Sequence, residues 1–179
     1  MKTIVRVFLT PQEHSEACHG GVNRRLRALE KHRAPNQPER KYHEQNWFQT
    51  SISGAVAEAA VAKMFGLQWQ DLEDDENGFD VLNYQVRSTE NPDGLLKVRR
   101  RDNPDHKFIF ARVRNNEVRI HGWSTGAAVI DNDQETFPDC FETPMYRLYP
   151  MTDLPEDIHW TDKWVTAYEQ PRPGLGTVV

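Results

Sequence analysis

Residues 79–89, FDVLNYQVRST, alternate apolar and polar side chains, which is the pattern of a half-buried β-strand. If residues 82–83 form a two-residue turn, Val81 pairs with Tyr84 in a β-hairpin. Val86 lies two residues after Tyr84 and therefore projects from the same face of the hairpin. That face is apolar, so we expect it to be buried in the core of the protein.

The opposite face of the same hairpin is polar. Asp80 lies directly opposite Gln85, with Cβ atoms roughly 5 Å apart, and Arg87 joins this face two residues later. A carboxylate, an amide oxygen and a cation are thus brought together, and the basic run KVRRR follows at residues 97–101. The pattern fits a metal-dependent site that handles phosphate, and it also fits a solvated hairpin without a function.

A helix is predicted over residues 51–65, SISGAVAEAAVAKMF, with Gly66 as its C-cap. Glu58 is the only charged residue between Ser51 and Ala62. A helix that is apolar around its whole circumference is typically buried, and a buried carboxylate must be protonated, ion-paired or bound to a metal. The alternative is that Glu58 projects from one exposed edge of the helix.

The remaining elements are short. Residues 2–9 favour a strand, and Thr10 and Pro11 favour the start of a helix that ends before Pro35. A polar connector is expected over residues 34–46, a short helix after Trp123, and largely irregular chain from Asp131. Five short strands are predicted in between, the last two joined by a turn at Asn115–Asn116: FDV, YQVRST, LLKVRR, KFIFARV and EVRIHGW.

Length and composition fit a single α/β domain of 179 residues with 37% hydrophobic residues and a net charge of -5. We divide it into a strand and basic helix (residues 1–50), a core (51–130) and an irregular C-terminal extension (131–179). The chain lacks the roughly 20-residue apolar run of a membrane span, and its start does not resemble a signal peptide. Its two cysteines are interpreted as reduced thiols, which indicates a cytoplasmic protein.

Acidic and basic residues are clustered. The acidic run at residues 71–76, DLEDDE, lacks the spacing of a calcium loop and is interpreted as a solvated loop. Because the net charge is negative, binding of a polyanion must depend on a local basic surface. Two groups of cations could provide it, although those of the first helix also fit an ordinary solvated face: Arg24 and Arg25 in the first helix, and Lys97, Arg99, Arg100 and Arg101 in the basic run.

The order of these motifs resembles the PD-(D/E)XK nuclease superfamily, the restriction-endonuclease-like fold, and more narrowly its small phage and prophage members. The resemblance covers roughly residues 50 to 155 and rests on short segments whose order and spacing match: GAVAEAAVAKMFGL, FDVLNYQVRST, LLKVRRRD, KFIFARV, EVRIHGWSTG and YRLYPMTDL. It implies a mixed β-sheet flanked by helices. For a phage-encoded member it implies action in the host cytoplasm.

The resemblance also implies the roles of the site residues. Glu58 and Asp80 fall on the positions that bind Mg²⁺ or Mn²⁺, and Gln85 and Arg87 fall on the (Glu/Asp)-x-Lys positions. Gln85 can offer the metal an oxygen but no charge, which should lower ion affinity. Arg87 stays protonated and cannot act as a general base, although it can stabilise phosphate charge. Lys97 could replace the usual lysine or contact a phosphate.

The leading hypothesis is therefore a divalent-metal-dependent nuclease that hydrolyses single- or double-stranded DNA. We expect no membrane partner, and a homodimer is possible. A second hypothesis is a nuclease-like module that has lost catalysis and binds nucleic acid or a partner protein, which the Gln-x-Arg pattern favours. A third is a structural or host-interaction protein with a solvated hairpin, which predicts no salt-dependent DNA binding.

Overall fold

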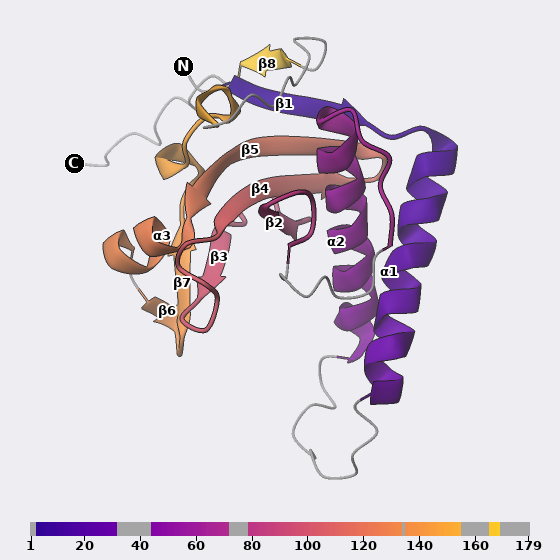
Figure 1. The fold of residues 1–179 in the computed structure, drawn as a ribbon, viewed down its shortest axis with the longest axis horizontal. Coiled ribbons are helices and arrows are strands. Elements are labelled where there is room, and N and C mark those ends of the chain that lie inside the picture. Colours follow the sequence, from indigo (N-terminus) through magenta and orange to yellow (C-terminus); the bar gives the residue numbers. More distant parts are fainter. Residues whose placement is uncertain (1–2, 32–43, 72–78, 134, 155–164, 169–179) are drawn as a thin grey trace, which may run out of the picture.

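The computed structural model describes residues 3–31, 44–71, 79–133, 135–154 and 165–168. The protein has mixed α/β architecture, with mixed sheets flanked by helices (Figure 1). Its helical elements are α1 (Pro11–Lys31), α2 (Glu44–Met64), α3 (Gly126–Asn132) and the short 3-10 turns η2 (Met145–Arg147) and η3 (Met151–Asp153). None of the helices in the described residues is both long and apolar enough to cross a bilayer.

The larger sheet has five strands in the order β2-β4-β5-β1-β8. Strand β2 pairs in parallel with β4, while β4 with β5, β5 with β1, and β1 with β8 are antiparallel. Strand β2 is therefore an edge strand of this sheet. The strand bounds are β1 (Thr3–Phe8), β2 (Tyr84–Thr89), β4 (Lys107–Arg114), β5 (Glu117–Thr125) and β8 (Val165–Tyr168).

A smaller antiparallel sheet has the order β3-β7-β6 and consists of β3 (Leu96–Arg99), β6 (Glu135–Phe137) and β7 (Cys140–Thr143). It shares a second hydrophobic cluster with one face of β4. Phe108 and Phe110 of β4 pack there with Val98 of β3 and Phe141 of β7. The smaller sheet and α3 thus cover one face of the larger sheet.

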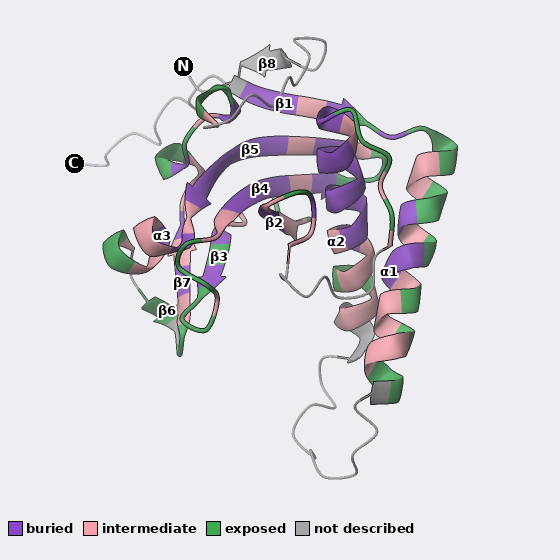
Figure 2. Ribbon diagram, viewed as in Figure 1, coloured by how far each residue is buried: buried purple, intermediate pink, exposed green. Residues whose placement is uncertain are grey.

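Helix α2 covers the other face of the larger sheet, and α1 runs along the outer side of α2 (Figure 1). Strand β4 alternates between the two faces, since Ile109, Ala111 and Val113 belong to the cluster that contains α2. Figure 2 shows buried residues along β4, β5 and the C-terminal half of α2, and exposed residues on the outer side of α1. Helix α2 therefore lies between α1 and the sheet.

The helix ends follow local chemistry. The backbone N–H of Glu13 donates to Thr10 Oγ1 at 3.2 Å, and the Thr10 N–H donates to Glu13 Oε2 at 2.7 Å, which makes a capping box at the start of α1. At the end of α2, Gly66 has a φ of 72°. The Leu67 N–H donates to the Ala62 carbonyl at 2.9 Å, as in a Schellman motif.

The hairpin turns predicted from the sequence are confirmed. Val81 and Tyr84 form an antiparallel bridge around Leu82 and Asn83, and Leu82 has a φ of 53°. The burial of β2 alternates as expected, with Tyr84 and Val86 buried. Strands β4 and β5 meet in antiparallel register at the Asn115–Asn116 turn, and Thr125 caps α3.

Three expectations need correction. FDV makes only the bridge at Val81 and not a strand. Helix α2 begins at Glu44, so it includes residues assigned to the connector and crosses the expected boundary between residues 50 and 51; the connector residues 34–43 lie outside the described residues. The chain after Asp131 is more regular than predicted, because β7 pairs with β3, β6 pairs with β7, and β8 pairs with β1.

Candidate active site

Glu58 lies in the buried part of α2. Its exposed fraction is 5%, and Ala57, Ala59 and Ala60 beside it are also buried. The prediction of a buried helix with one buried carboxylate is confirmed, and the alternative of an exposed edge is wrong. Burial raises the pKa of Glu58, and the nearby Asp80 carboxylate raises it further, against the lowering effect of hydrogen bonds.

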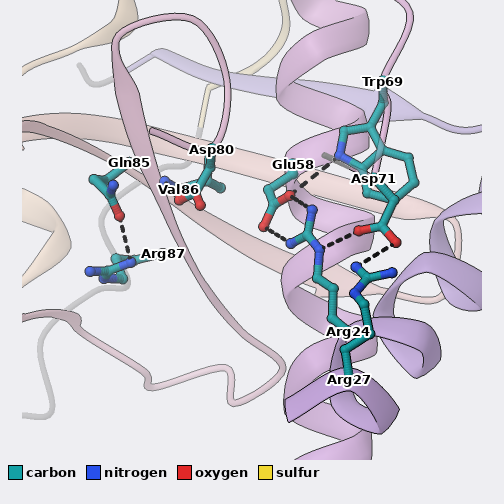
Figure 3. A network of polar contacts seen from close by, with 9 residues as sticks. All are labelled: Arg24, Arg27, Glu58, Trp69, Asp71, Asp80, Gln85, Val86 and Arg87. Atoms are coloured by element: carbon teal, nitrogen blue, oxygen red, sulfur yellow. Dashed lines mark hydrogen bonds and ion pairs between the residues drawn. The ribbon is translucent and has the colours of Figure 1, made fainter. Parts of the chain in front are cut away.

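The partner of Glu58 is an arginine from α1. Arg24 Nη1 and Nη2 each donate to one Glu58 carboxylate oxygen at 2.6 Å (Figure 3). Trp69 Nε1 donates to Glu58 Oε2 at 3.3 Å, and the Arg24 guanidinium carbon lies 5.5 Å from the centroid of the Trp69 ring. Glu58 is therefore ion-paired, one of the three states that its burial permits.

Asp71 holds the other side of the same guanidinium. Arg24 Nε donates to Asp71 Oδ1 at 2.7 Å, and Arg27 Nη2 donates to Asp71 Oδ2 at 3.0 Å. Burial opposes the charge on Arg24, but its bonds with Glu58 and Asp71 raise its pKa above the ordinary value. Both pKa values are raised, which favours the charged form of Arg24 but the protonated form of Glu58, because burial disfavours the Glu58 carboxylate. Two guanidinium donors at 2.6 Å need two accepting carboxylate oxygens, so we describe Glu58 as ionised near neutral pH.

Two glycines allow Arg24 to reach Glu58. A Cβ on Gly21 would lie 2.5 Å from Ile52 Cα in α2, and a Cβ on Gly20 would lie 2.5 Å from the ring of Trp69. Helices α1 and α2 therefore approach with backbone close to backbone at this point. Arg24 lies one turn farther along α1, close enough for its guanidinium to contact Glu58.

Asp80 occupies the start of the hairpin, at the edge of β2. Its carboxylate accepts a hydrogen bond from the Val86 N–H at 2.7 Å. Burial raises the pKa of Asp80, although the bond from Val86 and the charges of Arg87 and Arg24 oppose this effect. Asp80 thus lies between these two arginines and is close enough to Glu58 to raise its pKa.

Gln85 and Arg87 share the polar face of the hairpin and contact each other. Arg87 Nη1 donates to Gln85 Oε1 at 3.0 Å, and Arg87 Nη2 donates to Asp102 Oδ2 at 3.3 Å. The Arg87 guanidinium carbon lies 5.1 Å from the centroid of the Phe108 ring. The oxygen that the sequence assigns to a metal is therefore engaged by the neighbouring cation.

Two residues of the site, Glu58 and Asp80, carry oxygen atoms that suit a hard divalent cation. Within the described parts of the chain, no group of three or more His, Cys, Asp or Glu side chains is arranged to hold a metal ion. The buried Glu58 and the half-buried Asp80 nevertheless bring two carboxylates close enough for the charge of Asp80 to raise the pKa of Glu58. Carboxylate oxygens suit Mg²⁺ or Mn²⁺. Gln85 Oε1, the third predicted oxygen, is not brought to them, because Tyr84 and Val86 face α2 whereas Gln85 and Arg87 project to the other face of β2, beside Phe108.

An open groove of about 1350 Å³ begins at Arg87 and runs between β2 and the smaller sheet. All four cations of the basic run contribute to its lining, but much of the charge is paired. Lys97 Nζ lies 2.9 Å from Glu142, and Arg100 lies 3.3 Å from Glu135 and 3.4 Å from Asp139. The side chains of Arg99 and Arg101 have no carboxylate partner in the described part of the chain.

The two cations of α1 in the predicted nucleic-acid surface lie in different environments. Arg24 points inward to Glu58 and Asp71. The guanidinium carbon of Arg25 lies 4.1 Å from the centroid of the Trp47 ring, and Arg25 Nε is buried with no hydrogen-bond partner among the described residues. A contact between Arg24 and a phosphate would therefore require the loss of an existing ion pair.

Sequence reasoning missed Asp71, Trp69 and Asp102. Asp71 belongs to the acidic run interpreted as a solvated loop, and the rest of that run, residues 72–76, lies outside the described residues. The need of Glu58 for a cation was readable from the sequence, but the identity of that cation was not. Comparison with known proteins gave no match to any protein-family model, curated protein or solved structure.

Proposed function

We propose that the protein is a divalent-metal-dependent nuclease that hydrolyses DNA phosphodiester bonds, built on a restriction-endonuclease-like core of the PD-(D/E)XK type. One observation supports this most strongly. The buried Glu58 and the half-buried Asp80 are close enough for the charge of Asp80 to raise the pKa of Glu58, and Arg87, whose charge lowers the pKa of Asp80, lines the groove. Burial of two neighbouring acids is unfavourable unless cations compensate it.

Glu58 and Asp80 would hold Mg²⁺ or Mn²⁺, and Gln85 Oε1 would join them only after giving up its bond with Arg87. When bound, such an ion supplies Lewis-acid stabilisation of the phosphate and lowers the pKa of a coordinated water. Arg87 can donate two parallel hydrogen bonds to a phosphate, but it cannot accept the proton of the attacking water. That proton must leave to solvent or to another base.

The groove would take the DNA backbone. Among the described residues, Arg99 and Arg101 have no carboxylate partner, whereas Lys97 and Arg100 are balanced by carboxylates. Contacts to phosphates release counterions, so affinity should fall as the salt concentration rises. A groove with few uncompensated cations predicts moderate affinity and a shallow salt slope.

The test is cleavage of plasmid and single-stranded DNA with Mg²⁺ or Mn²⁺. We expect Asp80→Asn to reduce the rate by at least about 100-fold, because a metal ligand contributes several kcal/mol to transition-state stabilisation. Asp93→Asn is the matched control, since Asp93 is an exposed carboxylate of the groove lining that lies outside the proposed ligand set. Equal cleavage by the parent and Asp80→Asn, or no cleavage with either metal, refutes the nuclease.

A catalytically impaired module that binds nucleic acid or a partner protein is the second candidate. The contacts between Arg87 and Gln85 and between Arg24 and Glu58 favour it, because both engage oxygens needed by a metal. Calorimetric titration with Mn²⁺ separates the two candidates. Salt-dependent DNA binding without uptake of Mn²⁺ supports the binding module.

A further inference from the structure

The Arg24–Glu58 pair bears directly on metal uptake by the proposed nuclease. Both oxygens of the Glu58 carboxylate accept a hydrogen bond from Arg24 at 2.6 Å, and one of them also accepts from Trp69. Ligation of an ion by Glu58 must therefore weaken at least one of these contacts. Charge-assisted bonds to a buried carboxylate are among the stronger hydrogen bonds in proteins.

Arg24 has a second carboxylate partner that does not depend on Glu58. Its Nε donates to Asp71, which is also bonded to Arg27. A guanidinium that leaves Glu58 can thus keep one ion pair and its contact with the Trp69 ring. Without Asp71, displacement would leave an unpaired cation partly buried at the junction of α1 and α2, which is strongly unfavourable.

We propose that Arg24 competes with the divalent ion for Glu58, and that Asp71 retains the displaced guanidinium. This inference rests on the proposed nuclease function and adds a control of that same site. In the metal-free protein Arg24 compensates Glu58, and only an ion that binds more strongly than the guanidinium enters. The N-terminal helix α1 thereby sets the metal concentration at which the site fills.

The first experiment measures Mn²⁺ affinity by calorimetry for the parent protein, Arg24→Gln and Arg27→Gln. We expect at least about tenfold tighter binding by Arg24→Gln, because two competing charge-assisted bonds are removed. Arg27→Gln removes the same charge from α1 without removing a bond to Glu58, so we expect a change of less than about threefold. In the Arg24→Gln background, Glu58→Gln should abolish the gain.

A second measurement needs no substitution at Arg24. Addition of Mg²⁺ to the parent protein should shift two NMR signals, those of Arg24 Nε–H and Trp69 Nε1–H, because both groups contact the Glu58 site. Trp69→Phe assigns the indole signal among the five tryptophans of the chain. Binding of Mg²⁺ that leaves both signals unmoved overturns the competition.

The outcomes separate this inference from the function on which it rests. Parent and Arg24→Gln proteins that bind Mn²⁺ equally, with binding lost in Asp80→Asn, overturn the competition and leave the metal site intact. Absence of Mn²⁺ binding from both proteins overturns the metal site together with the competition. Tighter binding by Arg24→Gln alone supports both.

Discussion

The close approach of α1 and α2 gives a prediction that does not depend on the function. Gly21→Ala places a Cβ 2.5 Å from Ile52 Cα and 2.7 Å from the Ser51 carbonyl oxygen. Both of these atoms belong to the backbone of α2, so no side-chain rotation can relieve the contact. The two helices must move apart by a substantial part of an ångström, since ordinary carbon–carbon contacts lie at about 3.5–4.0 Å.

The expected magnitude follows from two opposing effects. Alanine is favoured over glycine inside a helix by about 0.5–1 kcal/mol. Overpacking of a well-packed region is unfavourable by about 1–3 kcal/mol. We therefore expect Gly21→Ala to lower the free energy of unfolding by about 1–2 kcal/mol, and the displacement of α1 should also weaken the bonds between Arg24 and Glu58.

Gly54→Ala is the matched control in the same helix pair. A Cβ on Gly54 would meet no atom within 4 Å, so only the helix preference applies and stability should rise by about 0.5–1 kcal/mol. Urea denaturation of the parent and both variants under one buffer condition measures the free energies, with equal m-values as the check on two-state unfolding. If Gly21→Ala proves as stable as Gly54→Ala, the backbone contact between the helices is not as close as described.

Three further predictions concern the site. With a chelator present, Asp80→Asn should become more stable relative to the parent as the pH rises from about 4 to 7. Burial raises the folded-state pKa of Asp80, so the parent loses stability as this group ionises. The opposite trend in denaturation experiments contradicts this shift. Arg99→Ala and Arg101→Ala should each reduce the salt slope of duplex DNA binding by about 0.9, measured by fluorescence anisotropy, whereas Arg6→Ala, on β1 and outside the groove, should leave it unchanged. Gln85→Glu should raise Mn²⁺ affinity by about tenfold in calorimetry because it adds a charged ligand; an unchanged affinity shows that this side chain does not bind the ion.

Local patterns allowed much of the fold to be predicted. The alternation in β2, the turns at residues 82–83 and 115–116, and the cap at Gly66 depend on neighbouring residues, and the structure confirms them. The strands after Asp131 were missed for the opposite reason. The partners of β7 and β8, which are β3 and β1, lie far away in the sequence, and prolines and polar residues obscure the pattern of these strands.

In the candidate site too, features that depend on local sequence were predictable and contacts between distant segments were not. The burial of Glu58 was predictable because α2 contains no other charge over most of its buried length. Its pairing with Arg24 was not predictable, since several cations on α1 could have met it and only the packing of two helices selects one. The glycine pair at residues 20–21 was a usable signal, because adjacent glycines inside a helix often mark a close backbone approach.

The bond from the Val86 N–H to Asp80 has a consequence for self-association. Strand β2 is the edge of its sheet, and an unprotected edge offers its N–H groups to a strand of another molecule. The Asp80 carboxylate satisfies one of these groups and places a negative charge beside it. Replacement by alanine would remove both the hydrogen-bond acceptor and the charge. Activity lost because the variant oligomerises could then be wrongly attributed to loss of a metal ligand. Asparagine retains an oxygen that can accept the bond from the Val86 N–H.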